Sequence, residues 1–333
     1  MKALRSHAPG GPLTLTLDEV ADPVPGDRDV LIRVAACAVN FPDLLMVADK
    51  YQFRPPRPFA PGAEVSGIVE RVGGGVSGFA PGDRVMALCS LGGMAEKLVV
   101  DADKCVLVPD FLPLDEAAAL QLTYGTAFYA IDVCGGLQTG ETALVLGAAG
   151  GVGLAGVELC RALGARVVAA VSSPEKADLA RSRGADETVE YPTGPLDRDA
   201  RRALAVRLRE AYGGPHLVLD PVGGDYTEAA LRAIRPGGRL AVIGFAAGIP
   251  AVPLNLVLLN DARIIAAAWG AVVARDPARF QRTIQGLLEL YQRKLIHPFI
   301  SKRLPLERGA DALAVIESRA ATGKILIEVD PSL

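Results

Sequence analysis

The stretch Thr142–Gly153, TALVLGAAGGVG, decides the fold because it joins a strand, a tight turn and the start of a helix. Its first five residues are a short apolar run of strand length, and Leu154–Leu163 carries the apolar spacing of a helix. Between them, Gly150 and Gly153 hold the second and third places of a G-x-G-x-x-G pattern. Ala148 holds the first place, so the match is imperfect.

This turn predicts a site for a dinucleotide. Gly150 allows the backbone to approach a pyrophosphate, and Gly153 allows the helix to pack closely on the strand. The free N–H groups of the first helical turn attract negative charge. The alternative is an ordinary connection between a strand and a helix. We expect the pyrophosphate contacts to come from Ala149, Gly150, Gly151, Val152 and Gly153.

Composition limits the classes of function. A chain of 333 residues, half of them apolar, is globular and long enough for two cores. The 35 basic and 38 acidic residues give a net charge of −3, which provides no electrostatic reason to expect a nucleic-acid or membrane partner. The five cysteines form no C-x-x-C pair, so a zinc ribbon or a disulfide framework is disfavoured. Without the apolar segment of a secretory signal, we expect a cytoplasmic protein.

The first hundred residues predict a unit rich in short strands. Leu13, Leu15 and Leu17 alternate with polar residues, and Val30, Ile32 and Val34 fall on one face of another strand. Glycine and proline turns separate these runs. The pattern changes at 115–130, an alanine-rich stretch that predicts a helix with Asp115 as its cap.

From Thr142 the pattern alternates between strand and helix, which predicts a doubly wound parallel sheet. In such a sheet, ligands bind at the carboxyl ends of the strands. The strands are expected at 142–147, 166–171, 188–189, 217–219 and 239–245, and the helices at 152–164, 174–184, 197–212 and 226–234.

The C-terminal part is expected to return to the first unit, because it is too short for a core of its own. It contains a long helix at 277–293 and a last strand at 324–329. We therefore predict one domain at 1–122 and 266–333 and a nucleotide-binding domain at 123–265.

Several motifs together resemble one family, the medium-chain dehydrogenase/reductases, and within it the zinc-independent quinone oxidoreductases and quinone oxidoreductase-like proteins. The resemblance implies a GroES-like, β-rich catalytic domain, a Rossmann domain with a doubly wound parallel sheet, and a homodimer. Besides the glycine turn, it is carried by Asn40-Phe-Pro-Asp43, Pro61–Gly67, Gly82-Asp83-Arg84-Val85, Thr123–Ala127, Asp220–Gly224, Pro236–Arg239 and Thr322-Gly-Lys324.

The resemblance also predicts a protein without a metal. In the zinc-dependent relatives, a cysteine stands at the place of Asn40 and a histidine at the place of Ala63. An amide and a methyl group cannot replace those zinc donors, and Glu64 alone makes no site. Polarisation of a carbonyl by a Lewis acid is then not expected, which disfavours simple alcohol dehydrogenation.

The residues after the second Rossmann strand predict the cofactor. An acid at that position binds the ribose 2′-hydroxyl and selects NAD. Here the sequence is Ser172-Ser173-Pro-Glu175-Lys176, and two hydroxyls with an ammonium favour a 2′-phosphate. We therefore predict NADPH, with Ser172, Ser173 and Lys176 near the phosphate. Glu175 opposes this prediction if it points inward.

Further site residues follow from the resemblance. Quinone oxidoreductases similar to this chain bind the 2′-phosphate at the positions of Ser172, Lys176 and Tyr191. The alternative makes Ser173 a helix cap, Lys176 a solvated side chain and Tyr191 a packed ring. The remaining residues that the resemblance assigns to the cofactor are Asn40, Thr126, Gly244, Phe245 and Lys324.

Two residues are candidates for catalysis. Asn40 corresponds to the residue that orients the nicotinamide in the family, and its alternative role is a turn cap. Tyr51 corresponds to a tyrosine that lines the substrate cleft, where a phenol can donate a hydrogen bond to a developing enolate oxygen. The alternative is a loop aromatic packed on Pro55 and Pro56. A second tyrosine of the family falls on Leu45 here, which makes the predicted cleft more apolar.

The predicted function is hydride transfer from NADPH to a small acceptor, a quinone or an α,β-unsaturated carbonyl. One alternative is an enoyl-thioester reductase, with Arg54 and Arg57 near the thioester tail. An alternative from another class is a nucleotide-binding protein with little turnover. Asp220, which ends a strand, is expected to be structural rather than a general base.

Overall fold

The computed structural model describes residues 1–333, which form two compact units. The first unit comprises Met1–Leu122, Val273–Ile284 and Pro298–Leu333, and the second comprises Thr123–Val272 and Gln285–His297. Both are therefore discontinuous in sequence. None of the helices combines the length and hydropathy needed to cross a membrane.

The first unit is built on β-sheet. Its seven-stranded sheet has the order β14-β15-β3-β4-β5-β7, with β6 paired to β3, and a separate pair is formed by β1 and β2. All pairings are antiparallel except that of β14 with β15. The strands are β1 Lys2–Ser6, β2 Leu15–Glu19, β3 Asp29–Val39, β4 Glu64–Val72, β5 Arg84–Leu88, β6 Lys97–Asp101, β7 Cys105–Leu107, β14 Ile300–Pro305 and β15 Lys324–Glu328.

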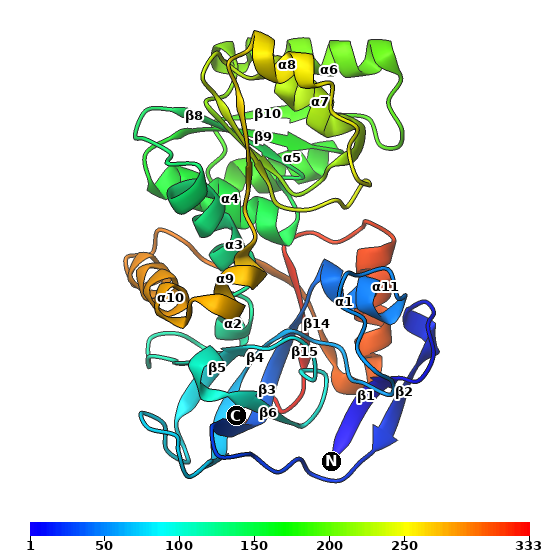
Figure 1. The fold of residues 1–333 in the computed structure, drawn as a ribbon, viewed down its shortest axis with the longest axis vertical. Coiled ribbons are helices and arrows are strands. Elements are labelled where there is room, and N and C mark those ends of the chain that lie inside the picture. Colours follow the sequence, from blue (N-terminus) through cyan, green and yellow to red (C-terminus); the bar gives the residue numbers. More distant parts are fainter. The chain divides into compact units, whose positions relative to one another are not determined.

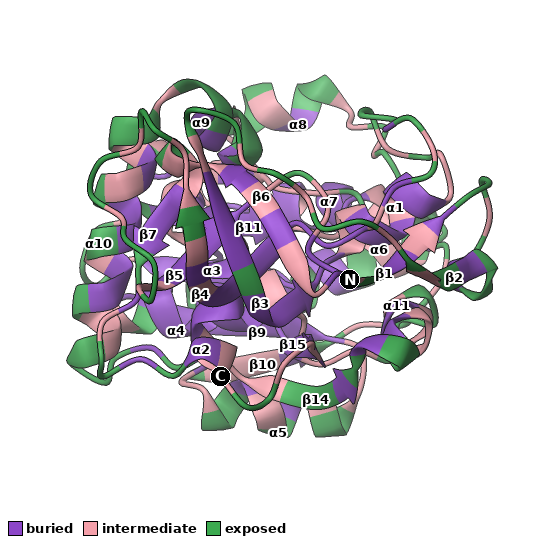
Figure 2. Ribbon diagram, turned by 90° about the horizontal axis from the view of Figure 1, so that it is seen from below, coloured by how far each residue is buried: buried purple, intermediate pink, exposed green.

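Strand β3 is the centre of this unit. It pairs with β4, β6 and β15, and nine of its eleven residues are buried, as the purple ribbon in Figure 2 shows. The alternating residues Val30, Ile32 and Val34 lie in the hydrophobic core, as their spacing predicts. The last strand, β15, joins the same core, so the C-terminal part of the chain completes the sheet that the N-terminal part begins.

The helices of the first unit are short. They are α1 Phe41–Val47, α2 Leu114–Ala118 and α11 Gly309–Glu317, with the 3-10 turns η1 Pro12–Thr14, η2 Ala102–Lys104 and η5 Leu306–Arg308. The prediction of one continuous helix over 115–130 is wrong in two respects. It is interrupted between α2 and α3, and its first cap is Pro113 instead of Asp115. At the interruption, the Leu122 backbone N–H donates to the Glu64 carboxylate, a distant contact that local sequence does not indicate.

The second unit is a doubly wound parallel sheet, as predicted. Its strand order is β10-β9-β8-β11-β12-β13, and every pairing is parallel. The strands are β8 Thr142–Leu146, β9 Arg166–Val171, β10 Glu187–Glu190, β11 Leu217–Asp220, β12 Arg239–Val242 and β13 Arg263–Ala266. Strand β12 ends before the predicted residue 245. The Ile243 N–H makes the last regular ladder bond, to the Asp220 carbonyl, and the Gly244 N–H donates to the same carbonyl, which departs from the parallel register.

Helices cover both faces of this sheet. Figure 1 shows α6, α7 and α8 on one side and α4 and α5 on the other. The helices that begin in this unit are α3 Thr123–Phe128, η3 Tyr129–Cys134, α4 Gly151–Ala162, α5 Pro174–Ser182, α6 Arg198–Glu210, η4 Ala211–Gly213, α7 Gly224–Ala233, α8 Leu254–Leu259 and α9 Trp269–Arg275. Helix α10, Pro277–Gln292, contributes its first half to the first unit and its second half to the second unit.

Candidate functional site

The glycine turn has the backbone that the sequence predicts. Strand β8 is buried along its whole length, and α4 begins at Gly151 with Gly150 as its N-cap. A Cβ on Gly153 would lie 2.1 Å from the Gly147 carbonyl oxygen, so only glycine permits this close packing of helix on turn. A Cβ on Gly150 would meet its nearest protein atom at 3.4 Å. This is ordinary van der Waals contact, and no other protein atom lies within 4 Å of the added Cβ. The protein itself would therefore tolerate a side chain here, and a requirement for glycine would come from a ligand that approaches the backbone.

Four predicted residues gather after two neighbouring strands. Lys176 donates from Nζ to Ser172 Oγ at 3.2 Å, and Ser173 caps α5 by accepting from the Lys176 backbone N–H at 3.3 Å. Tyr191 follows β10, which pairs with β9, and its backbone N–H donates to the Val171 carbonyl. Its ring lies 4.8 Å from the Tyr226 ring. Ser173 thus caps a helix and Tyr191 packs on another ring, as the alternative interpretation expects. The Lys176 ammonium and the Ser172 hydroxyl nevertheless lie together at the same edge of the sheet.

Glu175 lies in the first turn of α5 and is exposed. Its exposed carboxylate accepts a hydrogen bond from Ser173, which lowers the pKa of Glu175. An acid that selected the 2′-hydroxyl of NAD would have to reach the ribose from the end of β9. Glu175 is instead exposed and bonded to Ser173.

The carboxyl ends of β11 and β12 complete this edge of the sheet. Gly244 lies there as a half-buried residue and Phe245 is 40% exposed. Asp220 is buried and accepts from Val222 N, Gly223 N and the Thr227 hydroxyl. Burial raises the pKa of Asp220. The Asp220 carboxylate oxygens are thus bonded to the turn that follows β11 and to the start of α7. This geometry supports the structural role expected for Asp220.

Thr126 is buried in α3, which packs against α4. The preceding residue, Gly125, faces the buried Trp269 ring, and a Cβ at Gly125 would lie 2.6 Å from Trp269 Cε2. Tyr124 donates its hydroxyl to Glu158 of α4 at 2.7 Å. Packing on both sides thus fixes the helix that carries Thr126.

In the first unit, three polar side chains meet at the ends of three adjacent strands. Asn40 follows β3, while Glu64 begins β4 and Lys324 begins β15. The register brings them together because both β4 and β15 pair with β3 near its C-terminal end. The Lys324 ammonium lies 2.6 Å from Asn40 Oδ1 and 3.0 Å from Glu64 Oε2, and both charged side chains are buried. We call Asn40, Glu64 and Lys324 the buried triad.

Asp43 supports the backbone around the buried triad. Its carboxylate accepts from the Asn40 N–H at 2.8 Å and from the Gly62 N–H at 3.1 Å. Burial raises the pKa of Asp43 to about 6, although these two donors and the Lys324 ammonium oppose the shift. Sequence reasoning missed Asp43 as well as the pairing of Glu64 with Lys324. The only local signal is that Asp43 falls in the first turn of a helix, where acids are favoured.

Tyr51 lies apart from regular structure. It is half-buried in the loop between α1 and β4. Ala63, at the position of the zinc-binding histidine of related enzymes, is buried next to Glu64. No cluster of three histidine, cysteine or acidic side chains has a geometry suited to a metal ion.

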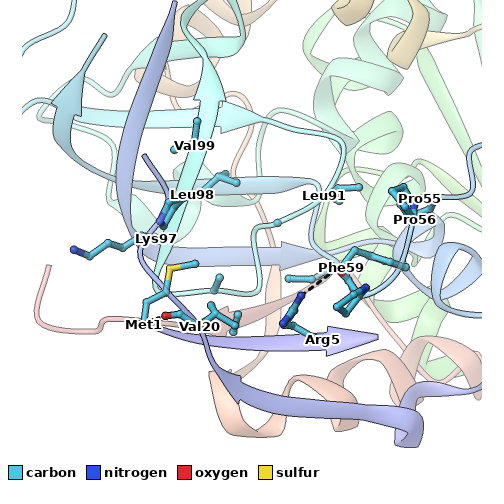
Figure 3. Close-up of a pocket in the computed structure, with 16 residues that line it drawn as sticks. Met1, Arg5, Val20, Pro55, Pro56, Phe59, Leu91, Lys97, Leu98 and Val99 are labelled. Atoms are coloured by element: carbon cyan, nitrogen blue, oxygen red, sulfur yellow. Dashed lines mark hydrogen bonds between the residues drawn. The ribbon is translucent and has the colours of Figure 1, made fainter. Parts of the chain in front are cut away.

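The first unit also has an open surface groove of about 460 Å³, which none of the predicted site residues lines. Figure 3 shows Pro55, Pro56 and Phe59 on one side of it and Leu98 and Val99 on another. Its basic groups already have acidic partners, since Arg5 pairs with Asp18 and Lys97 with Asp22. The groove therefore differs in place and in chemistry from the predicted site.

The fold and its glycine turn define an α/β protein with a nucleotide-binding sheet and a β-rich companion unit. Residues 26–110 match the alcohol dehydrogenase GroES-like domain family, and residues 151–292 match the family described as zinc-binding dehydrogenase. The mouse quinone oxidoreductase-like protein 2 is 39% identical over 317 residues, covering 95% of this chain and 89% of that protein. The pig quinone oxidoreductase is 30% identical over 330 residues, covering 98% and 97%.

Among solved structures, a mycobacterial protein complexed with NADPH superposes with a TM-score of 0.91 at 30% identity, covering 99% of this chain and 100% of that one. The chain therefore belongs to the quinone oxidoreductase family of the medium-chain dehydrogenase/reductases. The predicted family and fold class are confirmed, and the chain is an oxidoreductase of that family.

Proposed function

We propose that the protein is an NADPH-dependent reductase that passes hydride to a quinone or an α,β-unsaturated carbonyl without a metal ion. The observation that carries this proposal is the sheet edge that combines the uncrowded Gly150 turn with the Ser172–Lys176 contact. Relatives named as quinone oxidoreductases and a similar structure with bound NADPH support it. When bound, NADPH supplies the hydride, and the protein contributes binding, orientation and electrostatic stabilisation.

The proposed absence of zinc is supported by the donors at the family's zinc positions. Asn40 and Ala63 offer an amide and a methyl group, neither of which is a usual zinc ligand. The Lys324 ammonium supplies a positive charge beside Glu64, so that carboxylate is already neutralised by the protein. A second cation at the same carboxylate would be repelled by this ammonium. Measurement of the zinc content of the purified protein by mass spectrometry tests this part directly.

Tyr51 is proposed to stabilise the acceptor oxygen. A phenol can donate a hydrogen bond to the enolate or phenolate oxygen that forms as hydride arrives. Tyr51→Phe removes this donor and keeps the ring, so the expected result is a fall in kcat of about 10- to 100-fold with an unchanged affinity for NADPH. A Tyr51→Phe enzyme with the kcat of the wild type would restrict Tyr51 to packing.

The function is tested by NADPH and NADH oxidation against a benzoquinone, a naphthoquinone, a simple enone and a short enoyl thioester. Turnover of quinone or enone with preference for NADPH is expected. Turnover of the thioester alone would favour the enoyl-thioester reductase. Tight binding of NADPH without any turnover would favour a nucleotide-binding protein and would contradict the proposed catalysis for these acceptors.

Removal of the Lys176 ammonium tests the choice of cofactor. Lys176→Ala loses a charge-assisted contact to the 2′-phosphate, so the Kd for NADPH is expected to rise by about 10- to 100-fold. The Kd for NADH, which lacks this phosphate, should change less than about twofold. Isothermal titration of both cofactors measures the difference. Arg181→Ala, which removes an exposed cation from the same helix, is the matched control and should leave both values unchanged.

The protein is also proposed to form a homodimer through the edge of the second unit's sheet. Strand β13 ends the sheet, so its outer backbone groups lack a strand partner within the sheet. The segment that precedes β13 and includes α8 exposes apolar side chains. Most of α8 is accordingly drawn in the colours of exposed and intermediate residues, green and pink, in Figure 2. These side chains are Ile249, Leu254, Leu258, Leu259 and Ile264. A two-fold axis through β13 would pair this edge with itself and cover the same apolar surface on both copies.

A charge on this surface is expected to dissociate the dimer. Leu258 is 82% exposed, so Leu258→Glu should fold normally and yet place two carboxylates in the shared interface. Sedimentation should then give the mass of one chain where the wild type gives that of two. Leu13→Glu, at an equally exposed leucine of the first unit, should remain dimeric. Dissociation of both variants, or of neither, would contradict this interface.

A further inference from the structure

The buried triad contains a complete ion pair whose role is not explained by stability. The side chains of Glu64 and Lys324 are 0% and 3% exposed, and their charges lie 3.0 Å apart. Removing two charges from water costs much of the free energy that their attraction returns, so such a pair contributes little net stability compared with apolar residues. Buried ionic groups are retained in some proteins because they specify one arrangement of their neighbours. Here the neighbour that both charges contact is Asn40.

The two charges determine the orientation of the Asn40 carboxamide. Its Oδ1 accepts from the Lys324 ammonium at 2.6 Å, and its Nδ2 donates to the Ala38 carbonyl at 3.1 Å and to Glu64 Oε2 at 3.3 Å. An ammonium can only donate, and an ionised carboxylate can only accept. Rotation of the amide by 180° would place its NH₂ group against the ammonium and its oxygen against the carboxylate. Only one orientation is therefore compatible with both charges.

The hydrogen-bonding capacity that remains on Asn40 follows from this orientation. Both hydrogens of Nδ2 have partners in the protein, and the backbone N–H donates to Asp43. Oδ1 accepts from Lys324 and, in the capping box at the start of α1, faces the Asp43 backbone N–H. Any ligand group that bonds to this side chain must therefore donate to Oδ1, because Nδ2 cannot donate to it without losing an internal partner.

We propose that Glu64 and Lys324 are positioning residues that hold Asn40 as a hydrogen-bond acceptor toward the ligand. The inference rests on the proposed function and on the predicted contact of Asn40 with the nicotinamide side of NADPH. The group at Asn40 is then a donor, such as a carboxamide N–H or a ribose hydroxyl, and not the carbonyl oxygen of the acceptor. Lys324 acts on the reaction through Asn40, whereas a direct cofactor contact would require its ammonium to reach a phosphate.

The test uses the double variant Lys324→Met with Glu64→Gln, which removes both charges of the ion pair, so that neither partner is left as an ion without the other. Asn40 then loses the two charges that fix the orientation of its amide. The kcat for quinone reduction with NADPH is expected to fall at least about 10-fold, and the affinity for 2′,5′-ADP should change less than about twofold. An equal loss of affinity for 2′,5′-ADP would show a direct phosphate contact and overturn the inference. Lys97→Met, which removes a lysine paired with Asp22 and Glu70, is the control and should keep the kcat of the wild type.

A cycle with Asn40→Ala separates positioning from a general effect on folding. If the charges act through Asn40, the same double variant should lower kcat less than about twofold in an Asn40→Ala background. A full additional loss in that background would overturn the inference. Lys324→Arg, which keeps the charge and the donor, should retain more activity than Lys324→Met.

A spectroscopic measurement keeps the inference testable even if no acceptor is turned over. The Asn40 side-chain amide protons, assigned in NMR spectra by their loss in Asn40→Ala, should exchange slowly with solvent in the wild type. In the Lys324→Met and Glu64→Gln double variant they should exchange at least about 10-fold faster at an unchanged melting temperature. Unchanged exchange would overturn the positioning role. Absence of turnover in the wild type would instead contradict the proposed function alone.

Discussion

Gly150→Val is expected to weaken NADPH binding by at least about 100-fold while the protein remains folded. Gly150 adopts φ −79° and ψ 175°, an extended backbone that valine also adopts. The nearest protein atom to an added Cβ is 3.4 Å away, so the side chain would project into the space where we propose that the pyrophosphate lies. The stability should fall by no more than about 1 kcal/mol, the cost of a poorer N-cap. Titration calorimetry and thermal unfolding measure the two effects.

Gly153→Ala is the matched variant, because here the added methyl group meets the protein itself. Its Cβ would lie 2.1 Å from the Gly147 carbonyl oxygen and 2.7 Å from Ala148 Cα. The start of α4 would have to move, which is expected to cost about 1–3 kcal/mol of the free energy of unfolding. Tight binding of NADPH by a folded Gly150→Val protein would contradict the proposed pyrophosphate site.

Glu158→Ala is expected to lower the free energy of unfolding of the second unit by about 3 kcal/mol. The Glu158 carboxylate accepts from the Tyr124 hydroxyl at 2.7 Å, from the His297 N–H at 2.8 Å and from Arg183 at 3.0 Å. Burial raises the pKa of Glu158, although these donors oppose the shift. Glu158→Ala would remove the acceptor that these three donors share in a largely buried place. A fall in melting temperature of roughly 6–12 °C is expected.

Arg161→Ala is the control for this measurement. Arg161 lies one turn farther along α4, is 62% exposed and reaches Asp186 only at 3.9 Å. Its removal should change the stability by less than about 0.5 kcal/mol, as is usual for exposed ion pairs. If Glu158→Ala and Arg161→Ala had the same melting temperature, the three contacts of Glu158 would contribute no net stability.

The sequence predicted the fold class because local patterns coincide with the global arrangement. The apolar run before Gly147 and the periodic run after Gly153 determine β8 and α4 without any distant contact. The end of β12 and the interruption between α2 and α3 were predicted wrongly, since long-range hydrogen bonds determine both. The Gly244 N–H departs from the register at the end of β12 by donating to the Asp220 carbonyl, and Glu64 accepts from Leu122 at the interruption between α2 and α3.

The candidate site was predictable where residues adjacent in sequence carry it, as in the glycine turn and in Ser172–Lys176. The buried triad was not predictable from pattern, because Glu64 and Lys324 are separated by 260 residues. Glu64 in isolation suggests no site, and the partner that neutralises it becomes visible only when β4 and β15 pair with β3. The roles of the individual site residues remain predictions.

The position of β15 in the first unit's sheet has a consequence for synthesis of the chain on the ribosome. Strand β15 pairs with β3, although more than 280 residues separate Val39 from Lys324. Until residues 324–328 have emerged, the edge of β3 that receives them lacks its partner strand. Domains usually fold in order from the N-terminus as they are made. Here the unit that is started first can be finished only after the whole nucleotide-binding sheet has been synthesised, so a nascent chain exposes an unpaired strand edge that chaperones or aggregation could capture.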